Sequence, residues 1–169
     1  MSPPQTSARA GAARILAAAA VVAVLDIGYI AVLFVVVKPV LTPLQVFQSV
    51  AVGLLGREAY QGGLPTASLG AAMHCTVALS WTCVYRFVVL RVRRLASWAA
   101  SWSGTLVLGL LYGMFVWLSM DLLVLPLTRA RQVPPGSPMF FLHLVEHALL
   151  VGLPIAWILR PDVRAASRW

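Results

Sequence analysis

Four long apolar segments dominate this chain of 169 residues and set what it can fold into. A helix needs about 20 predominantly apolar residues to cross the hydrocarbon core of a bilayer. The segments lie at residues 15–37, 67–90, 101–125 and 139–159. Only 11% of the residues are charged and 60% are hydrophobic, whereas a soluble domain carries about a quarter charged residues. The sequence therefore predicts an all-α, membrane-embedded four-helix bundle whose short connections make neighbouring helices antiparallel.

Basic residues are distributed unevenly between the two sides of these segments. One side carries Arg9, Arg14, Arg86, Arg91, Arg93, Arg94, Arg160, Arg164 and Arg168, and the other carries Lys38, Arg57, Arg129 and Arg131. Cytoplasmic loops carry the excess of Lys and Arg. We therefore expect residues 1–14 and 161–169 to be cytoplasmic tails on either side of one transmembrane domain, 15–160. The same placement explains the net charge of +8 without a nucleic-acid partner.

The connection between the first two apolar segments contains a short helix of its own. Thr42, Pro43 and Gln45 have the spacing of a capping box with proline at the first helical position. Apolar residues then recur at helical spacing, which predicts an amphipathic helix at about 43–55. Two placements remain open: the helix lies on the non-cytoplasmic surface of the bilayer, or it packs on the bundle as a lid.

Ionisable side chains inside the apolar segments are the best indication of function. Such groups are costly in hydrocarbon unless they face protein or water and have partners. Counting from the ends of the segments at about 1.5 Å per residue places most of them in the outer half of the bilayer. We predict that they form one polar cluster, made of Asp26, His74, Asp121, His143, Glu146 and His147.

The pentad His143–His147 also has the spacing of the H-x-x-E-H pattern of inverted zinc proteases. That pattern needs a downstream acidic ligand, and only Asp162 follows, on the opposite side of the membrane. We therefore predict no catalytic residue.

Three interpretations of the cluster stay open. A metal ion could be held by His74, His143 and His147, or a haem by His74 and one histidine of the fourth segment. The third interpretation is a hydrogen-bonded polar cluster that requires no cofactor.

The third apolar segment contains Gly109 and Gly113 at GxxxG spacing. This spacing permits close approach of two helix backbones in a membrane. The contact could lie inside the bundle or between two copies of the chain.

Four stretches carry a resemblance to a known group of proteins. They read FQSVAVGLLG at 47–56, LGAAMH at 69–74, GLLYG at 109–113 and VGLPIA at 151–156. The chain resembles a widespread group of uncharacterised bacterial four-helix inner-membrane proteins, more distantly similar to YagU-type membrane proteins. The resemblance covers most of residues 15–160 and implies a location in the bacterial inner membrane. It implies no substrate.

These observations lead us to expect a multi-pass inner-membrane protein surrounded by lipid, with a second copy or another membrane protein as further partner. Small-solute or proton handling, or an accessory-subunit role, is the first functional hypothesis. A metal- or haem-binding membrane protein that uses its intramembrane histidines is the alternative.

Overall fold

The computed structural model describes residues 4–166, with side chains from residue 9 onward, and its regular elements in that range are all helical. Four helical stretches are long and apolar enough to cross a membrane: Arg9–Val37, Gly63–Arg91, Trp102–Leu127 and Pro138–Ala166. Their order and number confirm the predicted all-α fold with four spans. The fourth helical stretch ends seven residues beyond the predicted boundary at 159. The helix continues through Pro161 rather than ending before it.

The first span consists of α1 (Pro4–Ala31) and a π-helical turn, η1 (Val32–Val37). The second is α3 (Gly63–Arg91), which leads through the short α4 (Arg93–Ala99) into α5 (Trp102–Ser119). Two turns, η3 (Met120–Val124) and η4 (Leu125–Leu127), complete the third span. The fourth is made of α6 (Pro138–Glu146), η5 (His147–Gly152) and α7 (Leu153–Ala166).

Each of the three π-helical turns ends two residues before a proline. The pairs are Val37 with Pro39, Val124 with Pro126, and Gly152 with Pro154. Proline donates no backbone hydrogen bond, and its ring crowds the carbonyl four residues earlier. Widening the preceding turn relieves this conflict. These prolines therefore place irregular turns inside or at the ends of three spans.

Large apolar side chains cover the outside of the long helices. Val24, Phe87, Leu111, Phe115 and Leu149 are all about half exposed or more. In water, so much exposed apolar surface would be unfavourable, whereas lipid solvates it. Together with the four spans, this outer surface identifies a multi-pass membrane protein.

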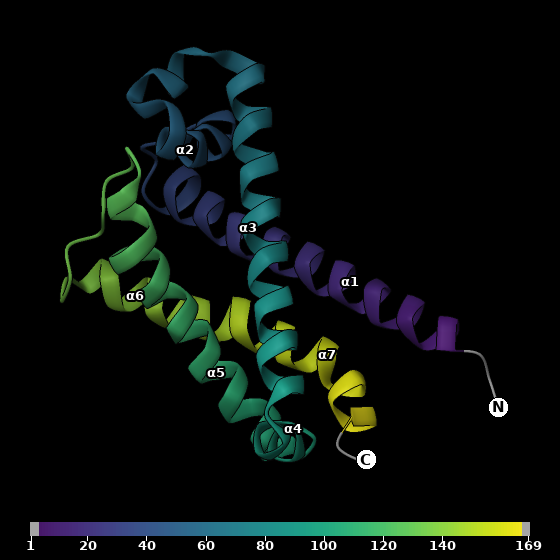
Figure 1. The fold of residues 1–169 in the computed structure, drawn as a ribbon. Helices are drawn as coiled ribbons and strands as arrows, with labels where there is room; N and C mark the ends of the chain where they lie inside the picture. The colour runs from purple at the N-terminus through teal and green to yellow at the C-terminus, as the bar shows by residue number, and fades with distance from the viewer. Residues whose placement is uncertain (1–3, 167–169) are drawn as a thin grey trace.

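The predicted amphipathic helix is α2 (Pro43–Leu55), and it begins with the predicted capping box between Thr42 and Gln45. It packs closely on α3, because a Cβ atom at Gly70 would lie 1.9 Å from the carbonyl oxygen of Phe47. The buried face includes Gln48, whose amide donates to the carbonyl of Gly63 and to the hydroxyl of Thr66. The helix thus packs on the bundle at one end, as Figure 1 shows at the upper left.

The GxxxG pair of α5 packs against the fourth span of the same chain. A Cβ atom at Gly113 would lie 2.1 Å from the carbonyl oxygen of His147, and one at Gly152 would lie 2.0 Å from that of Gly109. Only glycine permits backbones to approach so closely. The contact fixes η5, and with it His147, against α5.

Charged and aromatic residues join the helices at the opposite end, where Figure 1 places α4 and the end of α7. Asp162 forms ion pairs with Arg14 of α1 and Arg86 of α3. Arg160 stacks its guanidinium 3.4 Å from the ring centre of Trp102 and donates to the carbonyl of Ala100. These contacts tie α1, α3, α5 and α7 together at this end.

Candidate functional site

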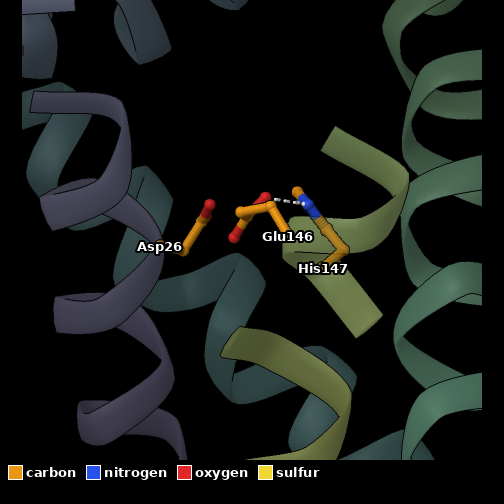
Figure 2. Close-up of side chains that lie close together, drawn as sticks. All are labelled: Asp26, Glu146 and His147. Atoms are coloured by element: carbon orange, nitrogen blue, oxygen red, sulfur yellow. Dashed lines mark hydrogen bonds and ion pairs between the residues drawn. The ribbon is translucent and has the colours of Figure 1, made fainter. Parts of the chain in front are cut away.

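Three ionisable side chains from two spans meet between α1 and the fourth span. Asp26 lies on α1, Glu146 is the last residue of α6, and His147 is the first residue of η5. One ligand atom from each lies within 4.8 Å of the other two. Figure 2 shows Glu146 between Asp26 and His147. We call these three residues the central cluster.

Glu146 is the most enclosed member of the central cluster. Its side chain is only 2% exposed, and its Oε2 lies 2.5 Å from Nδ1 of His147 in a hydrogen bond. Its other oxygen, Oε1, is buried and has no hydrogen-bond donor among the residues that the structure describes. An unsatisfied buried carboxylate oxygen is costly. Glu146 therefore has one oxygen available to bind a further group.

Side-chain rotation lets two consecutive residues contribute to one cluster. Side chains of neighbouring residues on a regular helix point about 100° apart and do not normally face each other. The backbone of both residues is α-helical, with φ and ψ of −56° and −52° at Glu146 and of −63° and −35° at His147. Nδ1 of His147 also lies 3.1 Å from the carbonyl oxygen of His143, so the ring folds back along the helix. This position brings its nitrogen to the carboxylate of Glu146.

His74 lies at the margin of the central cluster. Its Nε2 is 3.8 Å from Oδ2 of Asp26 and 3.0 Å from the carbonyl oxygen of Ala23. A carbonyl oxygen only accepts hydrogen bonds, so Nε2 of His74 carries the hydrogen and donates it to α1. This bond to Ala23 joins α3 to α1.

His143 faces aromatic rings rather than the carboxylates. Its ring centre lies 5.0 Å from that of Trp117 and 5.8 Å from that of Tyr29, the latter in an edge-to-face arrangement. The predicted metal ligands were His74, His143 and His147. The group whose ligand atoms converge within the described residues contains only His147 of these three, together with Asp26 and Glu146.

Asp121 holds a loop in place. It is fully buried, and its Oδ1 accepts a hydrogen bond from the backbone N–H of Val133 at 3.1 Å. Its own carbonyl accepts another from the side chain of Gln132 at 2.8 Å. Asp121 thus anchors the connection between α5 and α6 and lies outside the converging group.

Trp117 is a site residue that the sequence reasoning did not single out. Its ring centre is 5.0 Å from His143 and also 5.0 Å from His147, one helical turn apart on the fourth span. It is 7% exposed, and its indole nitrogen has no hydrogen-bond partner. The sequence feature that could have identified it is its position four residues after Gly113, on the face where α5 approaches the fourth span. Trp117 packs against the cluster from the side of α5.

The acidic residue that the protease pattern requires lies elsewhere. Asp162, the only acid after the pentad, is ion-paired with Arg14 and Arg86 at the end of the bundle near α4. Glu146 is itself bonded to His147. The donor set that does converge consists of two carboxylates and one imidazole, which together favour a cation.

The chain matches no protein-family model, no curated protein and no solved structure in the three comparisons made. The resemblance to bacterial four-helix inner-membrane proteins therefore remains a prediction from the sequence. Function has to be argued from the central cluster itself.

Proposed function

We propose that this multi-pass membrane protein handles a small cationic solute through the central cluster. The observation that carries the proposal is the buried carboxylate of Glu146, which has an oxygen without a partner beside a second carboxylate, Asp26. Two acids close together in a membrane interior attract positive charge, because an uncompensated anion is costly there. The cluster therefore favours a cation over an anion or a neutral molecule.

The position of the cluster along the spans supports a role in solute handling. Glu146 lies eight residues after Pro138, and Asp26 lies eleven residues before Val37. At 1.5 Å per residue these positions are roughly 12 Å and 16 Å from the ends of their spans. The side chains of Asp26 and His147 are 20% and 12% exposed, whereas Glu146 is enclosed. A solute would meet Asp26 or His147 before it reaches Glu146.

We further propose that the protein lies in the bacterial inner membrane with both ends in the cytoplasm. The end of the bundle that holds α4 also holds Arg14, Arg86, Arg160 and Arg164. The excess of basic residues belongs on the cytoplasmic side. In this orientation the central cluster lies in the outer half of the bilayer, nearer to α2.

Cation flux into vesicles tests the proposal. Purified protein is reconstituted into liposomes that contain a pH-sensitive or a metal-sensitive dye, and the entry of protons, monovalent cations and divalent cations is compared. We expect faster entry of at least one cation than in protein-free vesicles, and its loss in Glu146→Gln and Asp26→Asn. Glu58→Gln, which changes an exposed acid, is the control and should keep the flux. Equal rates in wild-type and protein-free vesicles for all cations would contradict the proposal.

A further inference from the structure

The donor atoms of the central cluster identify a class of cation. One oxygen from Asp26, one oxygen from Glu146 and one ring nitrogen from His147 lie within 4.8 Å of one another. Imidazole and carboxylate together suit borderline divalent metals such as Zn²⁺, Mn²⁺ or Co²⁺. Mg²⁺ and Ca²⁺ prefer all-oxygen sites, and Cu⁺ prefers sulfur ligands.

The charges of the cluster match a divalent ion. Two carboxylates carry two negative charges when ionised, and a neutral imidazole, with its hydrogen on the ring nitrogen that does not bind the ion, adds none. A divalent cation makes the sum zero, whereas a monovalent cation leaves one negative charge in a membrane interior, where unpaired charge is costly. Charge balance therefore favours a divalent ion once both acids are ionised.

The enclosed oxygen of Glu146 gives an independent reason to expect a ligand. The residue is 4% exposed, and Oε1 has no partner. Figure 2 shows the carboxylate directed between Asp26 and His147. Buried polar atoms in folded proteins are almost always satisfied. When Asp26 and Glu146 are both ionised they cannot hydrogen-bond to each other, and a bound metal ion would then satisfy this oxygen.

The spacing of the donors is compatible with metal binding after small side-chain movements. Metal–ligand bonds of about 2.0–2.2 Å in a tetrahedral site place ligand atoms roughly 3.4 Å apart. A pair at the 4.8 Å limit must therefore approach by about 1.4 Å, which rotation of the Asp26 and Glu146 side chains can supply. Three protein ligands leave a fourth position open, as in sites that exchange a ligand.

We propose that Asp26, Glu146 and His147 form a binding site for one divalent transition-metal ion inside the membrane. The inference rests on the proposed function, since it names the class of cation handled by the same cluster. It differs from the three-histidine site expected from the sequence, because His147 is the one histidine in the converging group of the described residues, while His143 packs on Trp117.

Metal content of the purified full-length protein tests this inference directly. The affinity tag is removed, bound metal is stripped with a chelator, and the protein is dialysed against Zn²⁺ before elemental analysis. We expect one Zn²⁺ per chain, and loss of that ion in Asp26→Asn, Glu146→Gln and His147→Gln. His143→Phe, which keeps an aromatic ring between Tyr29 and Trp117, should retain the metal.

A second readout uses Trp117, whose ring centre is 5.0 Å from that of His147. Co²⁺ in the cluster should quench the fluorescence of Trp117, and the quenched fraction should disappear in Trp117→Phe. The chain has six tryptophans, so the signal is the difference in quenching between wild type and Trp117→Phe, and it reports the location of the ion.

The outcomes separate the inference from the proposed function. Stoichiometric metal without cation flux in vesicles supports the site and contradicts the proposed function. Cation flux without bound metal supports the proposed function and overturns the inference. Absence of stoichiometric Zn²⁺ and Co²⁺ from the wild-type protein overturns the inference, as does metal that persists in Glu146→Gln but is lost in His143→Phe.

Discussion

Glu146 and His147 are consecutive in the sequence, and Oε2 of the first is hydrogen-bonded to Nδ1 of the second at 2.5 Å. Neighbouring residues on a regular helix do not normally face each other. The backbone of both residues is α-helical, and the ring of His147 folds back to the carbonyl of His143 at 3.1 Å. The contact therefore depends on the side-chain conformation of His147, at the residue where a π-helical turn begins, and such turns occur often at functional sites.

The glycine contact between α5 and the fourth span should be intolerant of a methyl group. Gly152→Ala would place a Cβ atom 2.0 Å from the carbonyl oxygen of Gly109. We expect the backbones to separate and the free energy of unfolding to fall by about 1–3 kcal/mol, measured by dodecyl sulfate titration in mixed micelles.

Gly28→Ala is the matched control for this change, because a Cβ atom at Gly28 meets nothing within 4 Å. It should leave stability unchanged or raise it by up to about 1 kcal/mol through helix propensity. Equal destabilisation by both substitutions would show that the α5 contact is looser than the structure indicates.

The ion pairs of Asp162 should stabilise the end of the bundle near α4. Asp162→Asn leaves Arg14 and Arg86 without their carboxylate partner. Breaking a fully buried pair costs about 3–5 kcal/mol. These arginine side chains are 37% and 34% exposed, so solvent screening reduces the expected loss to about 1–2 kcal/mol.

Unfolding in detergent micelles, followed by circular dichroism, measures the effect of Asp162→Asn. Added salt should reduce the difference from wild type, because mobile ions screen partly exposed charges. Stability equal to that of wild type at low salt would show that the three side chains contribute nothing together.

The buried amide of Gln48 should fasten α2 to the start of α3. Gln48→Ala removes the hydrogen bonds to Gly63 and Thr66, at 3.0 Å and 3.1 Å. We expect a loss of about 1–2 kcal/mol of unfolding free energy and faster backbone hydrogen exchange in α2. Gln61→Ala, at an exposed position of the neighbouring turn, should change neither quantity.

The proposed orientation can be tested with single cysteines. Cys75 and Cys83 are replaced by alanine, and a cysteine is placed at the exposed position Ser97 or Pro135. In intact cells an impermeant maleimide should label position 135 and leave position 97 unlabelled until the inner membrane is opened. Labelling of both positions in intact cells would place the two connections in one compartment, which four membrane spans do not permit.

The spans could be predicted from the sequence because apolar length is a direct requirement of the bilayer. The helix α2 could be predicted because Thr42, Pro43 and Gln45 form a complete start signal. Its buried face could not be predicted in full. Gln48 is polar and does not continue the apolar repeat, yet it is buried because Gly63 and Thr66 satisfy its amide. Such long-range partners leave no local pattern in the sequence.

The site was predictable in part. The cost of ionisable groups in hydrocarbon led to six candidates, which include Asp26, Glu146 and His147. Rotation at 100° per residue places His143 on the same face of the span, and its packing on Tyr29 and Trp117 depends on partners from other helices. Asp121 was indistinguishable from the others until the loop donors at Gln132 and Val133 could be placed beside it.

The central claim is that Asp26 of the first span and Glu146 of the fourth meet inside the membrane. Cross-linking tests it most directly, in native membranes, with Asp26→Cys and Glu146→Cys combined in a chain whose Cys75 and Cys83 are alanine. A short bifunctional thiol reagent should join residues 26 and 146, detected by mass spectrometry of the linked peptides. It should not join Asp26→Cys to Asp162→Cys, because the partner of Asp162, Arg14, lies roughly 18 Å from residue 26 along α1. Absence of the 26–146 link, or equal linkage of the 26–162 pair, would contradict the account.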